Sequence, residues 1–191
     1  AWQRTLVNGL FARVQTGPRK GRLRHRQALV GMPRKNGKTA LGAAIGLYGL
    51  FCGPVGAEVY SCAGEREQAR ICFGMAKQMV EAEPQLLSQA KLYRDVIEVP
   101  SQNAIYRVLS AEAYSKEGLS PTLVLFDELH VQPNDELWNV MTLGSAARVD
   151  PLVLGITTAG VRTDPLGRDS LCYRLYHDGM AVSLGEVNYP S

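Results

Sequence analysis

Apolar positions along the chain fall into short unbroken runs separated by amphipathic stretches. Unbroken apolar runs are typical of strands that are buried on both faces of a sheet, and they occur at residues 27–32, 58–63, 122–126 and 152–156. Apolar residues at helical spacing predict helices at residues 2–14, 40–51, 65–83, 134–143 and 168–180. The runs at 96–99 and 104–109 lie on either side of a polar Ser-Gln-Asn turn and predict a hairpin.

This alternation of strands and helices predicts an α/β fold with one mostly parallel sheet and helices on both faces. We expect the strands at 27–32 and 122–126 to lie near the centre of the sheet. Because no long linker interrupts the pattern, residues 1–191 are expected to form a single domain.

The composition is that of a globular protein, with 46% hydrophobic and 20% charged residues in 191. It excludes disorder, collagen and coiled coil. Residues 40–55 are glycine-broken and shorter than the roughly 20 apolar residues that a membrane span needs. The first residues lack the layout of a signal peptide, and the chain opens without Met, as a piece of a longer protein would. Four cysteines without a CxxC pair and three scattered histidines exclude a plausible zinc site and predict buried free thiols.

The net charge of +3 is distributed unevenly along the chain. Residues 1–57 contain ten Lys and Arg and no Asp or Glu, whereas the remainder contains 11 basic and 18 acidic residues. A basic cluster between Arg19 and Arg26 indicates a nearby polyanion, either nucleotide phosphates or a nucleic-acid backbone. A solvated basic loop beside a nucleotide site explains the cluster equally well.

The segment after the first buried strand has the features of a phosphate-binding loop. Gly37, Lys38 and Thr39 supply backbone N–H groups at a helix start, a lysine for the β/γ-phosphates and a hydroxyl for Mg²⁺. Met32 stands where the usual loop has its first glycine. Three further residues bring charge and polarity to the position of a triphosphate: Arg34, Lys35 and Asn36. The loop predicts ATP as the ligand.

Two carboxylates follow the third apolar strand. Asp127 and Glu128 lie just past its carboxyl end, where open α/β sheets bind ligands. Asp127 is suited to hold Mg²⁺ together with Thr39, and Glu128 to polarise an attacking water. Two solvated acids at a strand end are the alternative. Taken with the phosphate loop, the pair predicts a P-loop NTPase of the ASCE type, with ATP and Mg²⁺ as cofactors.

The fourth strand ends in Thr157, Thr158, Ala159 and Gly160. Small hydroxyl residues at the end of a neighbouring strand can sense the γ-phosphate and transmit its loss. The other interpretation is an ordinary turn.

Three segments in this order resemble the large terminase subunit of tailed bacteriophages: 34–39, 125–130 and 157–160. That family often lacks the first P-loop glycine and has an arginine where Arg34 stands. The resemblance implies an ATP-driven motor that packages double-stranded DNA into an empty capsid, with Gln3 as the adenine reader. It also implies a portal protein and a small terminase subunit as partners. The motor is expected as a ring in the host cytoplasm, transiently at the portal vertex, without membrane contact.

Family members carry a C-terminal ribonuclease H-type nuclease domain, and no matching acidic cluster occurs in these 191 residues. We therefore expect an isolated ATPase domain, monomeric in solution, without nuclease activity. A DExH-type helicase is the alternative function, since Asp127 to His130 also fits that motif. Its glycine-rich loop and second RecA-like domain are not found here. A binding scaffold without catalysis would be expected to have lost Lys38, Asp127 or Glu128.

Two arginine roles follow from position. Arg34 either bonds the γ-phosphate within the subunit or holds the loop by pairing with an acid, and its place in the loop favours the phosphate. A ring motor also needs a positive charge from the neighbouring subunit, because the transition state spreads charge over the γ-phosphoryl oxygens. Arg148 is the first candidate, with Lys116 and Arg162 as alternatives, and each is expected to be exposed at the domain edge.

Overall fold

The computed structural model describes residues 2–63, 65–110, 118–132, 134–158, 160–164 and 167–185. Its strands are β1 (Gln27–Gly31), β2 (Glu58–Ala63), β3 (Lys91–Leu92), β4 (Val96–Val99), β5 (Ala104–Ser110), β6 (Leu123–Asp127) and β7 (Leu152–Thr157). Its helices are α1 (Trp2–Leu10), α2 (Lys38–Phe51), α3 (Arg66–Ala82), α4 (Pro84–Leu87), α5 (Glu136–Ser145) and α6 (Leu171–Ser183). Short 3₁₀ turns cover Pro100–Gln102 and Leu129–Val131.

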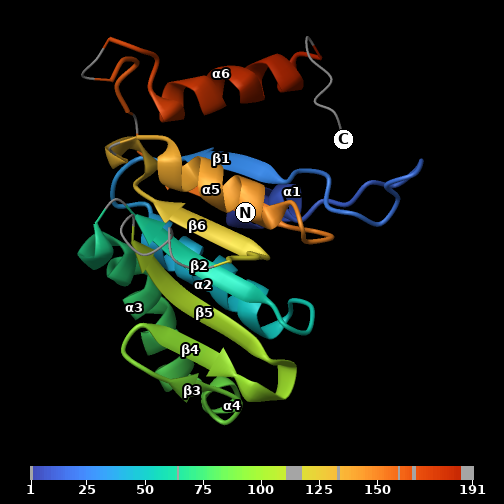
Figure 1. The fold of residues 1–191 in the computed structure, drawn as a ribbon, viewed down its shortest axis with the longest axis vertical. Coiled ribbons are helices and arrows are strands. Elements are labelled where there is room, and N and C mark those ends of the chain that lie inside the picture. Colours follow the sequence, from blue (N-terminus) through green and yellow to red (C-terminus); the bar gives the residue numbers. More distant parts are fainter. Residues whose placement is uncertain are drawn as a thin grey trace.

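The strands form one sheet in the order β1-β7-β6-β2-β5-β4-β3 (Figure 1). The first five of these are parallel to one another, and β4 and β3 are antiparallel additions at one side. The expected mostly parallel α/β sheet is therefore confirmed, as is the hairpin of β4 and β5. The expectation that residues 27–32 lie centrally is wrong. Within the described residues β1 pairs only with β7, and Val30 is its one fully buried side chain.

Helices cover both faces of the sheet because the strands alternate their apolar side chains. Leu123 and Leu125 of β6 belong to the core beneath α2 and α3, whereas Val124 and Phe126 pack with α5. Figure 1 shows α2 and α3 behind the sheet and α5 in front of it, above β6 and β7. Trp138 of α5 packs its ring 5.1 Å from that of Phe126.

Close packing of α2 against the sheet depends on small residues. A Cβ added at Gly46 would lie 2.8 Å from the Tyr106 ring and 2.9 Å from Leu125. A larger residue there would push away the helix that begins with the phosphate loop. The glycines that make this segment a poor membrane span thus fit it to a soluble core.

Element boundaries differ most where local turns intervene. The first helix ends at Leu10 rather than near residue 14, because Arg13 forms an antiparallel bridge with Leu23. The last helix begins at Leu171, after Ser170 accepts a hydrogen bond from the Tyr173 N–H and caps it. Short β3 and α4 were not expected from the sequence.

Membrane and thiol chemistry can be stated for the described residues. No helix there has both the length and the apolar content to span a bilayer. Cys62, Cys72 and Cys172 are buried free thiols, as expected, whereas Cys52 is exposed. Burial raises the pKa of the Cys72 thiol to about 12, so it stays protonated.

Candidate active site

The sheet brings three predicted motifs to its carboxyl edge. β7 lies between β1 and β6, with Gly31 opposite Thr157 and Asp127 opposite Ile156. The phosphate loop that follows β1 and the acidic pair that ends β6 therefore flank the two threonines at the end of β7. Ligands bind at this edge in open α/β sheets.

The phosphate loop is shaped by its own backbone and by Asn36. Gly37 has φ +76°, which places a left-handed residue just before α2 and suits glycine. The Asn36 amide donates to the carbonyls of Pro33 and Arg34, at 3.4 and 3.2 Å. Asn36 thus braces the loop from within. Arg34 and Lys35 are both exposed, and Arg34 makes no ion pair with a described residue.

Lys38 and Glu128 meet above this edge. Lys38 is 7% exposed, and its Nζ lies 3.5 Å from Glu128 Oε1. Glu128 has φ +54°, a left-handed conformation that costs a non-glycine residue about 1–2 kcal/mol. That conformation turns the chain from β6 into the 3₁₀ turn and brings the carboxylate to the lysine. Strain at such a point is typical of a functional residue.

Thr39 and Asp127 form the second polar contact at the edge. The Thr39 hydroxyl donates to Asp127 Oδ2 at 3.2 Å, and the Glu128 N–H donates to Oδ1 at 3.0 Å. Asp127 is 3% exposed, and burial raises its pKa above the ordinary value. A buried carboxylate and a hydroxyl are hard oxygen donors, which is the donor set that Mg²⁺ prefers. These two residues fit the expected metal.

His130 joins the acidic pair to the β7 threonines. Its Nδ1 lies 3.0 Å from Thr157 Oγ1 and 3.3 Å from Glu128 Oε2. Because Thr157 donates its hydroxyl proton to the Thr158 carbonyl at 2.9 Å, its oxygen accepts from His130. The Thr158 hydroxyl points to Glu128 Oε2 at 3.5 Å. A continuous polar chain thus runs from Glu128 to the end of β7.

Glycines let these segments approach one another. A Cβ at Gly160 would lie 3.0 Å from His130 Cβ, and one at Gly155 would lie 2.7 Å from Leu129 Cδ2. Gly160 therefore has a packing reason to be glycine, beyond a simple turn. Cys172 of α6 also contacts this cluster, with its thiol 4.0 Å from Thr157 Oγ1.

A buried polar group supports the first turn of α2 from below. The Cys72 thiol of α3 donates to the Thr39 carbonyl at 3.8 Å and lies 3.9 Å from the Tyr106 hydroxyl. Ser61 of β2 hydrogen-bonds both the thiol and the phenol. The residue that carries the metal-binding hydroxyl is therefore held from two further elements.

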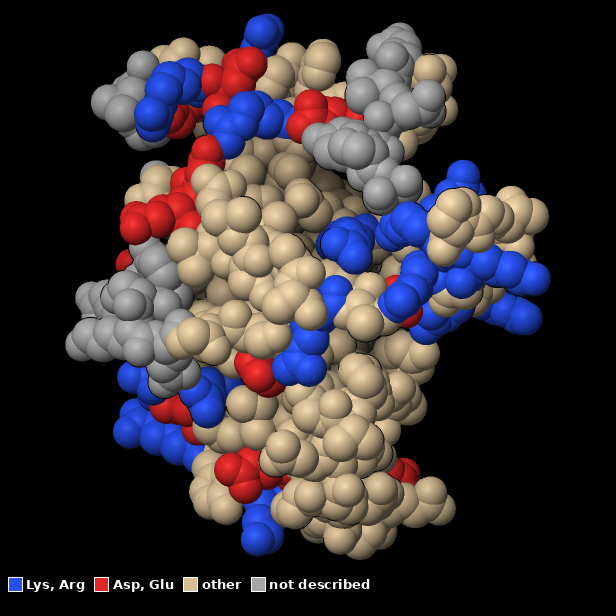
Figure 2. Space-filling view, turned by 45° about the vertical axis from the view of Figure 1, so that its right-hand side comes forward, with Lys and Arg blue, Asp and Glu red and all other residues tan. Residues whose placement is uncertain are grey.

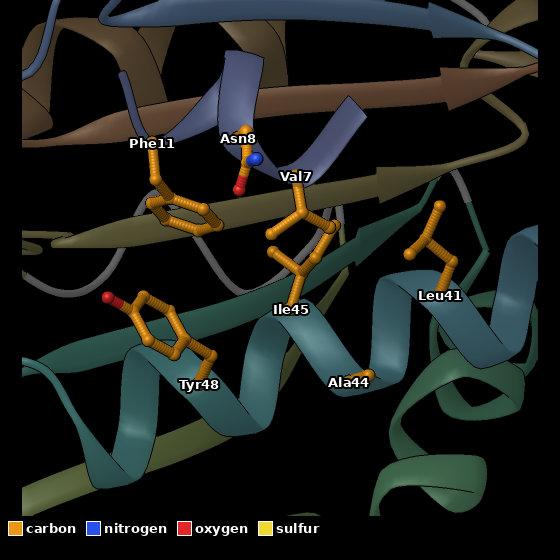
Figure 3. Close-up of a pocket in the computed structure, with 7 residues that line it drawn as sticks. All are labelled: Val7, Asn8, Phe11, Leu41, Ala44, Ile45 and Tyr48. Carbon is orange, nitrogen blue, oxygen red and sulfur yellow. The ribbon is translucent and has the colours of Figure 1, made fainter. Parts of the chain in front are cut away.

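Gln3 lies on α1, which packs along α2. Figure 3 shows Val7 above Ile45 and Phe11 above Tyr48, with Leu41 beyond Val7. The rings of Phe11 and Tyr48 are 4.7 Å apart. Since α2 starts at the phosphate loop, α1 runs alongside it in the same direction, and Gln3 lies toward the loop end. Gln3 itself is exposed.

An apolar groove of about 440 Å³ lies between the same two helices. Its lining residues are Val7, Asn8, Phe11, Leu41, Ala44, Ile45 and Tyr48 (Figure 3). None of the predicted phosphate, metal or carboxylate residues lines it. The groove is therefore separate from the polar cluster at the carboxyl edge.

Arg148 is not where the sequence analysis expected it. Its guanidinium donates to the carbonyls of Ser120 and Gly56, at 2.7 and 2.9 Å, and pairs with Glu58 at 3.1 Å. These partners stand at the amino ends of β6 and β2, on the edge opposite the phosphate loop. The side chain is only 23% exposed. Arg148 is a partly buried structural arginine, and its expected exposed position is wrong.

The other finger candidates have different outcomes. Arg162 is 69% exposed, pairs with Asp169 at 3.5 Å and lies 5.0 Å over the Tyr173 ring. Lys116 lies outside the described residues.

Sequence reasoning assigned no role to His130 or to the Cys72 group. The available signal for His130 was its position two residues after Glu128. The Ser61, Cys72 and Tyr106 contacts join β2, α3 and β5, so no local pattern could have indicated them.

Comparisons with known proteins agree with this site. The family model "Terminase large subunit, ATPase domain" matches residues 1–178. The large terminase subunit of Enterobacteria phage HK97 is 37% identical over 139 residues, covering 69% of this chain and 27% of that protein.

Solved structures show the same fold. The crystal structure of the HK97 large terminase has a TM-score of 0.76 at 27% identity, covering 97% of this chain and 37% of that one. The ATPase domain of the Thermus phage P74-26 large terminase has a TM-score of 0.58 at 15% identity, covering 86% and 84%. The chain thus spans about a quarter to somewhat over a third of the HK97 protein's length. By the match over nearly its whole length, this chain belongs to the ATPase-domain family of the terminase large subunit.

Proposed function

We propose that this domain hydrolyses ATP and thereby drives double-stranded DNA into a viral procapsid. The observation that carries the proposal is the convergence of buried Lys38, buried Asp127 and strained Glu128 at one edge of the sheet. Buried charges are costly unless they serve a ligand or each other, and these three are placed as an ATPase requires. The family assignment favours a packaging motor over the helicase alternative.

Each residue at the edge has a part in this reaction. Lys38 binds the β/γ-phosphates, Thr39 and Asp127 hold Mg²⁺, and Glu128 orients the attacking water. When bound, Mg²⁺ supplies charge neutralisation to the phosphates. Arg34, exposed and without a described acid partner, bonds the γ-phosphate. A large terminase from a thermophilic bacteriophage has been solved in complex with ADP, which supports a nucleotide at the same place in this fold.

Release of the γ-phosphate is proposed to reach the rest of the domain through β7. Glu128 contacts both His130 and Thr158, so a change at the carboxylate is felt by the threonines. Gly160 keeps this segment close to His130. Gln3, at the loop end of α1, is proposed to read the adenine. Lys116 and Arg162 remain as candidates for the charge that a neighbouring subunit donates.

The assembled protein is proposed to act as a homo-oligomeric ring with a portal protein and a small terminase subunit, in the host cytoplasm at the portal vertex. In isolation we expect residues 1–191 to be a monomeric, weak ATPase that leaves DNA uncut. Incubation with plasmid and Mg²⁺ or Mn²⁺ checks the last point. Cleavage that survives purification controls would contradict it.

The reaction is tested by separating ATP binding from turnover. Glu128→Gln should bind ATP as the wild type does and lower kcat by about 100-fold or more, because the water loses its base. Lys38→Ala should weaken both binding and turnover. Glu136→Gln on α5 and Lys77→Ala on α3 are the matched controls and should retain wild-type kinetics. Turnover by Glu128→Gln at the wild-type rate would overturn the assignment.

A further inference from the structure

Residues 12–26 form a hairpin that carries much of the chain's uncompensated charge. The Val14 N–H donates to the Arg22 carbonyl at 2.9 Å and the Arg24 N–H donates to the Ala12 carbonyl at 2.8 Å. Between these strands the chain turns through Gly17 and Gly21, both with positive φ. We call this segment the basic hairpin; its basic side chains are Arg13, Arg19, Lys20, Arg22, Arg24 and Arg26.

The basic hairpin stands on the opposite edge of the sheet from the nucleotide site. It leads directly into β1, whose five residues span about 17 Å before the phosphate loop begins. The Arg26 carbonyl accepts from the Val153 N–H at the start of β7. The interpretation of the cluster as a loop beside the nucleotide is therefore wrong, and nucleotide phosphates do not explain its charge.

A single acid fixes the basic hairpin to the sheet. Asp150, just before β7, accepts from Arg13 Nη1 at 3.0 Å and from the Leu23 N–H at 3.1 Å. Leu23 is 5% exposed and anchors the inner side, and Arg19 donates to its carbonyl at 3.2 Å. The segment is thus a held structure. Two of its basic residues are used to hold it.

The remaining cations face solvent. Lys20, Arg22, Arg24 and Arg26 are exposed and make no ion pair with a described residue. Figure 2 shows the Lys and Arg side chains gathered on the right of the molecule, over the segment that projects on that side of Figure 1, with little acid among them. Four exposed cations without counter-ions form a site for a polyanion.

The chemistry of the basic hairpin distinguishes between polyanions. It has no Phe, Tyr or Trp, so it offers no ring on which unpaired bases could stack. It also lacks the exposed apolar and aromatic centre of a protein interface. Arginine and lysine without aromatics fit the regular phosphates of a duplex, which they contact without reading sequence.

We propose that the basic hairpin binds the phosphate backbone of double-stranded DNA, through Lys20, Arg22 and Arg24 above all. This rests on the proposed function only for the identity of the polyanion. The contact lies at the amino edge of the strands, with the whole length of β1 between it and the ATP site. DNA binding and the chemical step therefore occupy separate surfaces.

The test measures affinity for a labelled 30-base-pair duplex by fluorescence anisotropy over a series of salt concentrations. The variant Lys20→Gln/Arg22→Gln/Arg24→Gln is compared with Lys77→Gln/Lys91→Gln/Arg94→Gln, which removes the same charge from α3 and the region around β3. The hairpin variant should lower affinity on the order of tenfold and reduce the salt slope by about 2–3, near 0.9 per lost phosphate contact. The control should leave the slope within about 0.5 of the wild type.

Other outcomes overturn the proposal. Equal slopes for the two triple variants, or no duplex binding by the wild type, would contradict it. So would competition by single-stranded DNA or polyglutamate that matches unlabelled duplex charge for charge. Basal ATP turnover of the hairpin variant is measured in parallel and should equal that of the wild type. Failure of the DNA proposal with intact turnover is thus distinct from failure of the ATPase proposal, in which no variant or wild-type protein hydrolyses ATP.

Discussion

The two edges of the parallel sheet carry opposite kinds of charge arrangement. At the carboxyl edge Lys38, Asp127 and Glu128 are buried or half-buried and lie against one another or against Thr39. At the amino edge the basic hairpin leaves four cations in solvent and uses one acid, Asp150, as a brace. Burial demands pairing, because an isolated charge loses its hydration, whereas an exposed charge needs no partner. The carboxyl edge is therefore suited to chemistry and the amino edge to a large polyanion.

The largest expected effect comes from exchanging one acid on each edge. Asp127→Asn should lower kcat by about 100-fold or more, since a metal ligand is lost. Asp150→Asn should leave turnover within about twofold, because it lies across the sheet from the phosphates. Steady-state ATPase kinetics checks both. Equal losses of kcat in the two variants would remove the functional distinction between the edges.

The same pair should separate in stability and in its pH dependence. Burial raises the pKa of Asp127, so the folded chain binds its proton more tightly than the unfolded chain does. Folding stability associated with this group is therefore present below the unfolded value near 3.8 and is lost as pH rises through the raised value. Asp127→Asn should raise Tm at pH 7, with the gain shrinking toward pH 4. Asp150→Asn should lower Tm at pH 7, and a fall for both would contradict the account.

Arg34 should show a split between kcat and KM. Arg34→Ala is expected to lower kcat by about 10- to 100-fold with KM for ATP changed less than about threefold, because a guanidinium fork stabilises the transferring phosphoryl more than the ground state. Lys35→Ala, next in the same loop, is the control. Unchanged kcat for Arg34→Ala would leave that side chain without a catalytic role.

His130 should have a smaller effect that a conservative change restores. His130→Ala removes the donor that links Glu128 to Thr157 and should lower kcat about tenfold with ADP affinity unchanged. His130→Asn places an N–H donor near the Nδ1 position and should recover part of the rate. His177→Ala, exposed on α6, is the control. Equal rates for the alanine and asparagine variants would show that packing alone matters.

Arg148 should affect folding and not activity. Arg148→Gln breaks a partly buried ion pair with Glu58 and two bonds to carbonyls, which should cost about 1–3 kcal/mol of unfolding free energy. Denaturant titration measures the loss, and kcat should stay within about twofold. In assembled rings, Arg148→Ala subunits mixed with Glu128→Gln subunits should show no activity beyond that of the Arg148→Ala subunits present. Recovered activity would return Arg148 to the finger role.

The carboxyl edge was largely predictable because its residues follow strands in sequence. Gly37 to Thr39, Asp127 and Glu128, and the two threonines each stand at the end of an apolar run, and parallel pairing brings such ends together. Their local patterns carry the whole argument. The position of β1 at the side of the sheet was not predictable, since strand order depends on long-range pairing that leaves no periodic trace.

The amino edge was less predictable for the same reason. Arg148, Glu58 and Ser120 are far apart in sequence, and each alone resembles a surface residue. The basic cluster was visible as composition, yet its place relative to the phosphate loop required the hairpin turn and the Asp150 brace. Contacts that join distant segments decide whether a charge is structural, catalytic or free.

The most direct test of the account is a crystal structure of the 191-residue chain with Mg²⁺ and a non-hydrolysable ATP analogue. The account predicts the phosphates at the carboxyl edge, within hydrogen-bonding distance of Lys38 and Arg34. It also predicts the metal on Thr39 and Asp127 and the basic hairpin free of nucleotide. Phosphates seated on Lys20, Arg22 and Arg24, or an analogue in the groove between α1 and α2 with the carboxyl edge empty, would contradict it.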